Sequence, residues 1–226
     1  MRKMTTKKVI MFDLDGTLSD PKDGILRSVD YALNQMGIQR EGEELLSFIG
    51  PPLQDSFKDH FSFTENEVHT AISHYRERYQ ALGKYENTLY PDVELMLNTL
   101  KEVGYRLAVA TSKPTVFAND ILAHFKLETY FDCVVGSELD GTRSDKGEVI
   151  SYALSLLQVK PEDVVMIGDR VHDIAGAQTC GVDSIAVSYG YGSEEELAAA
   201  GATHRVNGMN ELLNLLVKEK QLNSIN

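Results

Sequence analysis

The sequence predicts an α/β protein with a doubly wound, Rossmann-like parallel sheet and an inserted all-α cap. Three observations support this fold class: short apolar runs alternate with amphipathic helical patterns, aspartates end two of the runs, and one long interval holds helical patterns alone. Repeated strand–helix–strand units favour a parallel sheet with helices on both faces. With 226 residues, 42% of them hydrophobic, the chain can bury a sizeable core.

Five apolar runs have the length and β-branched content of buried parallel strands. In chain order they are KKVIMFDLD at 7–15, YRLAVATS at 105–112, FDCVVGS at 131–137, DVVMIGD at 163–169 and DSIAVSYG at 183–190. Helical patterns separate them: PDVELMLNTLKEVG at 91–104, KPTVFANDILAHF at 113–125 and KGEVISYALSLLQV at 146–159. In an open sheet of this kind, ligands bind at the carboxyl ends of the strands.

The interval from about Ser19 to Tyr85 breaks this alternation. It shows no strand pattern, and its helical patterns lie at 24–37, 42–50, 51–61 and 64–83. A helical insertion of this size after the first strand predicts a separate cap over residues 19–85, and a core domain over 1–18 and 86–226. Within the cap, Gly50, Pro51 and Pro52 predict a turn.

Charge and composition exclude several classes of protein. The formal net charge of −12 argues against nucleic acid as a partner, because binding a polyanion requires clustered cations. The apolar run near the N-terminus has only four residues before Asp13, against about 7 to 15 for a signal peptide and about 18 for a membrane span. The two cysteines, Cys133 and Cys180, lack metal-ligand spacing and are expected to be reduced, buried thiols. We therefore expect a cytoplasmic protein with no membrane partner.

Aspartates crowd the predicted ligand-binding edge. Asp13 ends the first run, and Asp15 follows within the motif DLDGT at 13–17. The motif GDRVHD at 168–173 brings Asp169 to the end of the fourth run and Asp173 one helical turn further on. Acidic residues at strand ends can be solvated loop charges, but the recurrence at two strand ends favours a bound cation. Carboxylate oxygens in this number suit Mg²⁺, which completes its ligand set with waters and a phosphate.

Other residues in the pattern suit a phosphate group. Thr111 and Ser112 close the second strand, where hydroxyl and backbone donors near a helix N-terminus favour an anion. Lys146 opens the next helix and can neutralise a phosphate held against carboxylates. Taken singly, Thr-Ser is a common helix cap and a lysine is usually a solvated surface charge. The order of Thr111, Ser112 and Lys146 along the chain favours a phosphate-binding role over a helix cap and a solvated surface charge.

With these motifs in this order, the sequence resembles the haloacid dehalogenase superfamily of phosphatases. The resemblance covers essentially the whole chain, with DLDGT, ATS at 110–112, Lys146 and GDRVHD similar to its first to fourth motifs. The helical insertion resembles the cap of the phosphoglycolate phosphatase-like branch. The stretches GPPL, ATSKPTVFA, VGSELDG, MIGDR and YGYGSEEEL resemble the group described as predicted phosphatases or 5′-nucleotidases. Lys146-Gly147 departs from the Lys-Pro pattern common in that branch.

The resemblance implies a Mg²⁺-dependent hydrolysis of a small phosphomonoester through an aspartyl-phosphate. Asp13 would be the nucleophile and Asp15 the general acid and base. Thr111 and Lys146 would bind the transferring phosphoryl oxygens. The implied metal ligands are Asp13, the main-chain carbonyl of Asp15, Asp169 and Asp173, and the implied substrate-binding residues are Gly16, Thr17, Ser112, Arg170 and the cap turn Gly50, Pro51 and Pro52.

A second copy of Leu-Asp-Gly-Thr occurs in SELDGTRSD at 137–145. It reads Glu138-x-Asp140 in place of the Asp-x-Asp pair, and Gly136 and Ser137 separate it from its strand. We interpret this copy as a loop that leads to Lys146, not as a second active site.

Several other functions remain open on the sequence alone. A phosphorylatable receiver domain also combines strand-end aspartates, a Thr or Ser and a lysine, but it needs no helical cap. A non-catalytic phospholigand sensor would have no need of the full set of motif residues. Within enzymes, a phosphosugar mutase or a pyrophosphatase of the same superfamily is the nearest alternative. Candidate substrates are phosphoglycolate, nucleoside 5′-monophosphates and sugar phosphates, and the expected state is a monomer or weak homodimer.

Overall fold

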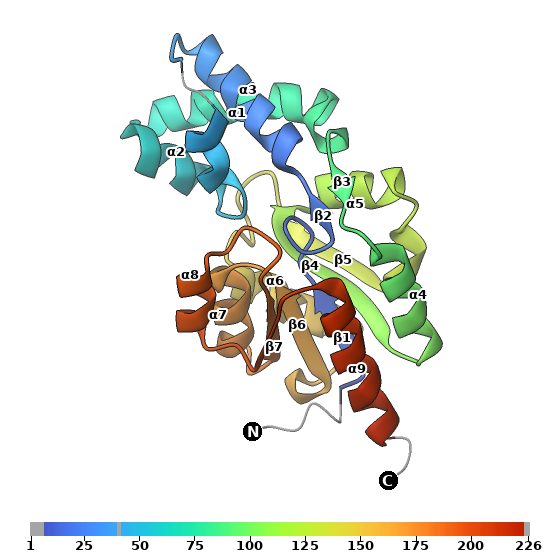
Figure 1. The fold of residues 1–226 in the computed structure, drawn as a ribbon. Coiled ribbons are helices and arrows are strands. Elements are labelled where there is room, and N and C mark those ends of the chain that lie inside the picture. Colours follow the sequence, from blue (N-terminus) through green and yellow to red (C-terminus); the bar gives the residue numbers. More distant parts are fainter. Residues whose placement is uncertain (1–6, 40–41, 224–226) are drawn as a thin grey trace.

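A six-stranded parallel sheet lies at the centre of the structure, a computed structural model that describes residues 7–39 and 42–223. The strand order is β5-β4-β1-β6-β7-β8 (Figure 1). The strands are β1 (Val9–Phe12), β4 (Arg106–Pro114), β5 (Cys133–Ser137), β6 (Val164–Gly168), β7 (Asp183–Val187) and β8 (His204–Val206). The five predicted strands are confirmed. The sixth, β8, was not predicted because its three residues HRV form no apolar run.

Strand β1 lies between β4 and β6, which fixes where the motifs meet. Phe12 at its end is in register with Val109 of β4 and Ile167 of β6. Because the three strands are parallel, the residues that follow β1 and β6 emerge at the same edge of the sheet. The chain runs from β1 outward through β4 to β5 and then crosses to β6, so this edge contains the point where the strand order reverses.

Helices cover both faces of the sheet, which confirms the doubly wound prediction. On one face lie α4 (Val93–Glu102), α5 (Thr115–His124) and α9 (Met209–Asn223), and on the other lie α6 (Lys146–Leu157) and α7 (Val171–Thr179). Strand β1 alternates between these layers: Ile10 and Phe12 join the first core, Val9 and Met11 the second. The helix α8 (Glu194–Ala200) packs beside α7 through Leu197. Within the described residues, no helix has the length and apolar character needed to cross a membrane.

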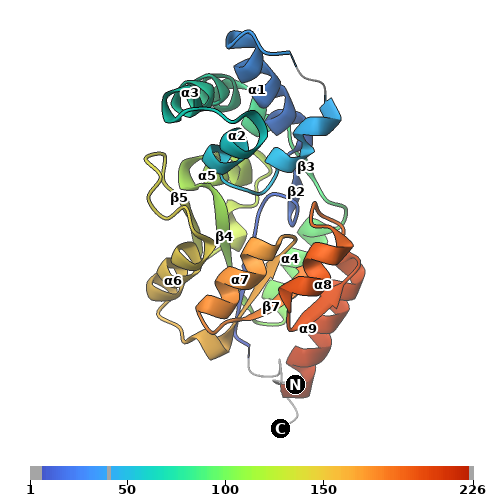
Figure 2. The ribbon, with the colours of Figure 1, turned by 90° about the vertical axis from the view of Figure 1, so that its left-hand side faces the viewer.

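A helical insertion lies between β1 and β4 and has a hydrophobic core of its own. It consists of α1 (Lys22–Gln35), the 3₁₀ helix η2 (Gly42–Phe48), α2 (Leu53–Phe61) and α3 (Glu65–Ala81). Figures 1 and 2 show α1, α2 and α3 gathered beyond one end of the sheet, on the side where β2 and β3 lie. Thr64 caps α3 in a reciprocal capping box with Glu67. The buried side chains of α1 to α3 pack together and also contact Phe117 of α5.

Two short strands connect the helical insertion to the sheet. Strand β2 (Ser19–Asp20) pairs antiparallel with β3 (Thr88–Leu89), so the chain enters and leaves the helical insertion side by side. The expectation of no strand from Ser19 to Tyr85 is therefore wrong at its first two residues, because a two-residue strand carries no readable periodicity. The pattern at 42–50 forms a 3₁₀ helix rather than an α-helix. Further 3₁₀ turns are η3 (Gly83–Tyr85), η4 (Glu128–Tyr130) and η5 (Pro161–Asp163).

Both cysteines are free thiols. They are half-buried rather than buried, which corrects the expectation of fully buried side chains. Burial raises the pKa of Cys133 to about 11, so this thiol is a poor nucleophile at neutral pH.

Candidate active site

Asp13 is the first residue after β1 and is fixed at the carboxyl edge of the sheet. Its backbone N–H donates to the carbonyl of Ile167 at 2.8 Å, which extends the pairing of β1 with β6 by one residue. The N–H of Leu14 donates to Oδ1 of Asp13 at 2.8 Å. The side chain of Asp13 is buried except for a small exposed part. These contacts hold one carboxylate oxygen in place beneath the helical insertion.

The turn after Asp13 brings its backbone close to β6. Gly16 has a φ of +81°, and its N–H donates to the carbonyl of Ser19 at 2.8 Å. A Cβ at Gly16 would lie 2.1 Å from Oδ2 of Asp169, so only glycine permits this approach. The hydroxyl of Thr17 donates to Oδ1 of Asp169 at 3.4 Å. The structure thus places both Gly16 and Thr17 against Asp169.

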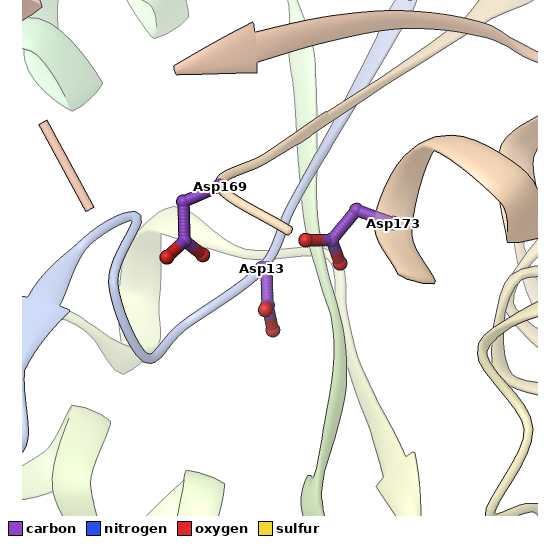
Figure 3. Close-up of side chains that lie close together, drawn as sticks. All are labelled: Asp13, Asp169 and Asp173. Atoms are coloured by element: carbon purple, nitrogen blue, oxygen red, sulfur yellow. The ribbon is translucent and has the colours of Figure 1, made fainter. Parts of the chain in front are cut away.

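Three buried carboxylates form an acidic cluster, shown in Figure 3: Asp13, Asp169 at the end of β6 and Asp173 in the first turn of α7. One oxygen from each lies within 4.8 Å of the others. The N–H of Tyr191 donates to Asp169 at 2.7 Å and the N–H of Arg170 to Asp173 at 3.0 Å. The sequence motifs DLDGT and GDRVHD are therefore brought together, as predicted from their strand ends.

The electrostatics of the acidic cluster fit a divalent cation. Burial, together with the negative charges of Asp173 and Asp13, raises the pKa of Asp169 well above its usual value. Burial also raises the pKa of Asp173 to about 6, although Lys146 acts in the opposite direction. Crowded carboxylates without a cation resist ionisation, whereas a bound cation restores it. Hard oxygen donors in this number fit Mg²⁺ better than a softer metal.

Lys146 is buried against the same carboxylates. Its Nζ lies 2.7 Å from Oδ1 of Asp173 and 3.1 Å from Oδ1 of Asp13. Asp145 caps α6 by accepting hydrogen bonds from the backbone N–H groups of residues 147 and 148, which fixes Lys146 as the first helical residue. Burial lowers the pKa of Lys146, but Asp13 and Asp173 outweigh it and raise the pKa above its ordinary value. A charged ammonium therefore lies against the carboxylate of Asp13.

Thr111 and Ser112 lie inside β4, shortly before the end of the strand. The strand continues to Pro114, and α5 begins at Thr115, because the residues after Ala110 form an irregular extension of the pairing with β5. Thr111 is buried, and its hydroxyl accepts a hydrogen bond from the N–H of Lys113 at 3.2 Å. Ser112 lines the cavity above the sheet. The strand therefore continues two residues beyond Ser112, and the helix N-terminus expected near this pair begins three residues after Ser112.

Asp15 contacts a residue that the sequence analysis did not assign. Nζ of Lys113 lies 2.7 Å from Oδ2 of Asp15, and both side chains are largely buried. Lys113 also donates to the hydroxyl of Tyr79 on α3, and its ammonium lies 4.7 Å from the centre of the Tyr79 ring. The side chain of Asp15 is therefore not part of the acidic cluster. The signal for Lys113 was its position directly after ATS, but sequence could not show that it reaches Asp15.

A cavity of about 160 Å³ opens between the sheet edge and the helical insertion. Asp15 lines the cavity, whereas Asp13 and Asp169 of the acidic cluster are not among its lining residues. Other lining residues include Gly50, Pro51, Pro52, Phe48, Tyr75, Arg76, Tyr79, Lys113 and Phe117. The predicted cap turn therefore faces this cavity.

Arg170 holds the cap turn from the sheet side and does not line this cavity. Its Nη1 donates to the carbonyl of Ile49 at 2.6 Å, and its Nε donates to Glu196 at 2.9 Å. Gly50 has a φ of +107°, and a Cβ there would lie 2.7 Å from Nη1 of Arg170. Arg170 is one of the residues expected to bind substrate, and in the structure its contact with Ile49 positions the cap turn.

The second Leu-Asp-Gly-Thr copy forms an exposed turn after β5. Oδ1 of Asp140 accepts a hydrogen bond from the N–H of Thr142 at 2.9 Å, which lowers the pKa of this carboxyl. The N–H of Glu138 donates to the carbonyl of Thr142 at 2.8 Å and closes the turn. Asp140 lies in no acidic cluster of the described residues. Its position agrees with the interpretation of a loop leading to Lys146.

Known proteins resemble the chain over most of its length. The family model described as haloacid dehalogenase-like hydrolase matches residues 10–187. A 5′-nucleotidase from Pseudomonas aeruginosa is 47% identical over 196 residues, which cover 86% of this chain and 89% of that protein. The tyrosine-protein kinase PtkA from Mycobacterium tuberculosis is 38% identical over 197 residues, covering 87% of this chain and 67% of that protein. A crystal structure of a predicted phosphatase from Clostridium acetobutylicum has a TM-score of 0.91 and 47% identity, covering 94% of this chain and 99% of that one.

Proposed function

The chain belongs to the haloacid dehalogenase-like hydrolase family and is one of its phosphatases, and from this premise we propose that it hydrolyses a small phosphomonoester through an aspartyl-phosphate. The observation that carries the proposal is the contact of Asp13 with Lys146 inside the acidic cluster. This contact places a carboxylate oxygen able to attack phosphorus next to an ammonium able to offset the charge of the transferring phosphoryl group.

In the first step, an oxygen of Asp13 forms a bond to phosphorus while the ester oxygen leaves with the bonding electrons. Asp15 donates a proton to the departing alkoxide, and in the second step it takes a proton from the water that cleaves the aspartyl-phosphate. The support for this role is that Asp15 lines the cavity from which a leaving group would depart. Lys113, which lines the same cavity, pairs with the carboxyl of Asp15 at 2.7 Å.

Lys146 and Thr111 are proposed to bind the phosphoryl oxygens. Lys146 supplies a positive charge next to the nucleophile, where negative charge accumulates during transfer. The residues proposed to hold Mg²⁺ are Asp13, the main-chain carbonyl of Asp15, Asp169 and Asp173. When bound, Mg²⁺ would neutralise the phosphoryl charge and relieve the repulsion within the acidic cluster.

The helical insertion is proposed to act as a cap over residues 19–85 that selects the leaving group. It supplies most of the aromatic and proline walls of the cavity, whereas the reacting groups come from the sheet edge. The name of the Pseudomonas relative supports nucleoside 5′-monophosphates as one substrate class, and phosphoglycolate and sugar phosphates remain the others. The two free thiols support a cytosolic location.

The Asp13→Asn variant tests the proposal. It keeps the shape of the side chain but removes the nucleophile, so turnover should vanish while the folded state persists. Rapid quench of the wild type with ³²P-labelled substrate and Mg²⁺ should trap a label on protein that hydroxylamine removes. Undiminished steady-state release of phosphate by Asp13→Asn would overturn the assignment.

The same experiment separates hydrolysis from transfer. Hydrolysis delivers the label to free phosphate, whereas a mutase or a kinase delivers it to a sugar or to a tyrosine hydroxyl. Supplying a tyrosine-containing peptide or a bisphosphate activator should therefore leave the yield of free phosphate unchanged.

A further inference from the structure

Arg76 is a cavity-lining cation without a visible partner. It lies on α3, is half-buried, and its Nε is shielded from solvent without a hydrogen-bond acceptor. Among the side chains that the structure describes, no carboxylate forms an ion pair with it. Arg78, two residues along the same helix, pairs with Glu86 at 2.7 Å. The difference sets Arg76 apart from an ordinary surface arginine, because a shielded N–H donor is costly when left unpaired.

The carboxylates that line the cavity are already paired with other cations. Asp15 pairs with Lys113 at 2.7 Å, and Glu138 pairs with Arg143. Neither is available to neutralise Arg76, so the cavity contains a fixed positive charge. The remaining walls are largely apolar and aromatic, including Phe48, Tyr79 and Phe117. In such surroundings an electrostatic contact is stronger than in water.

Arg76 and Asp15 line the same cavity from opposite domains. Asp15 belongs to the turn after β1, and Arg76 belongs to the helical insertion. Tyr75, the residue before Arg76 on α3, also lines this cavity. A leaving group that accepts its proton from Asp15 must occupy this cavity. The part of the leaving group remote from phosphorus then comes within the reach of α3.

We propose that Arg76 binds a second anionic group, a carboxylate or a second phosphate, on the leaving group of the substrate. This inference rests on the proposed phosphatase function and narrows its substrate class. A guanidinium offers Nε–H and an Nη–H as a fork that matches two oxygens of either group. Burial lowers the pKa of Arg76, and an anion bound there would offset that burial. Phosphomonoesters with an uncharged leaving group lack this contact.

Matched substrate pairs test the inference. The first pair is 2-phosphoglycolate and 2-hydroxyethyl phosphate, which differ by a carboxylate. The second is propane-1,3-diol bisphosphate and its monophosphate, which differ by a phosphate. With Mg²⁺ present, the wild type should prefer the anionic member of at least one pair by about 10- to 100-fold in kcat/KM, the range expected for a hydrogen bond to a charged group. The pair that shows the preference identifies the anion.

The Arg76→Gln variant should abolish that preference. The loss should fall on KM of the anionic member more than on kcat, because the contact exists before and during the reaction. Lys160→Gln is the matched control, since it removes the same unit of charge from a side chain that is 77% exposed and away from the cavity. Circular dichroism and thermal melting establish that both variants are folded. Arg76→Lys, which keeps the charge but not the fork, should retain part of the preference.

The outcomes distinguish this inference from the proposed function. Hydrolysis of p-nitrophenyl phosphate, and its loss in Asp13→Asn, reports the phosphatase reaction independently of Arg76. A wild type that hydrolyses p-nitrophenyl phosphate but prefers neither anionic member overturns the inference alone, and this holds even if Arg76→Gln fails to fold. An equal loss in Arg76→Gln on uridine 5′-monophosphate and on both members of each pair would also overturn it, because Arg76 would then act on cavity shape.

Discussion

Nζ of Lys113 lies 2.7 Å from Oδ2 of Asp15, and this contact joins β4 to the turn after β1. Lys113 also donates to the hydroxyl of Tyr79 on α3, so one buried ammonium contacts the sheet edge and the helical insertion together. Burial raises the pKa of Asp15, and Lys113 acts against that rise. The pair therefore stabilises a carboxylate that would otherwise be buried without a counter-charge.

The first prediction concerns this pair. Lys113→Met should lower the free energy of unfolding by about 3 kcal/mol, because removing one partner leaves a buried charge uncompensated. The double variant Asp15→Asn Lys113→Met should recover part of the loss, since both charges are gone. Urea denaturation followed by circular dichroism measures the free energy of unfolding of the wild type, Asp15→Asn, Lys113→Met and the double variant. If the two single losses simply added, Asp15 and Lys113 would not be coupled.

The second prediction concerns the acid role of Asp15. Asp15→Asn should reduce the phosphorylation rate with an alkyl phosphate by about 10² to 10⁴, the usual contribution of a general acid. An aryl substrate such as p-nitrophenyl phosphate should lose far less, because its leaving group departs without a proton. Single-turnover kinetics isolate this step. Equal losses on both substrates would contradict the acid role.

The third prediction compares Asp140, in the loop after β5, with Lys146, the first residue of α6. Lys146→Ala should reduce kcat/KM by about 10² or more, because it removes a positive charge from a water-poor site. Asp140→Asn should keep most of the activity, since Asp140 is exposed and accepts a hydrogen bond from Thr142 within its own turn. Lys146→Arg should not restore full activity, because a planar guanidinium replaces a compact ammonium poorly. Thermal melting must show each variant folded, and a damaging Asp140→Asn would contradict the loop interpretation.

The fourth prediction concerns the turn at Gly50. Gly50→Ala should reduce kcat/KM by about 10-fold or more, because its Cβ would meet Arg170 and displace a turn that lines the cavity. Gly37→Ala is the matched control: Gly37 also has a positive φ, +75°, but no atom lies within 4 Å of its Cβ position. Both variants should lose about 1 to 3 kcal/mol of stability through backbone strain. Equal kcat/KM values for Gly50→Ala and Gly37→Ala would show that the turn does not depend on the Arg170 contact.

The sequence alone determined the fold class and the position of the acidic cluster. Buried parallel strands require continuous apolar runs, so the five longest strands were readable, and the aspartates that end two of them had to emerge at the same edge. Local patterns failed where structure is short or irregular. Strands β2, β3 and β8 have two or three residues each, and the residues after Ala110 leave the regular pairing with β5.

Only the tertiary structure decided which side chains meet across the cavity. Lys113 and Arg76 lie 37 positions apart in the sequence, and no spacing rule connects either one to Asp15. The contacts arise because β2 and β3 bring the helical insertion back over the sheet edge, where its helices pack around their own core. A pairing of this kind depends on how two hydrophobic cores are placed against each other, whereas a strand or helix pattern depends on its own segment alone.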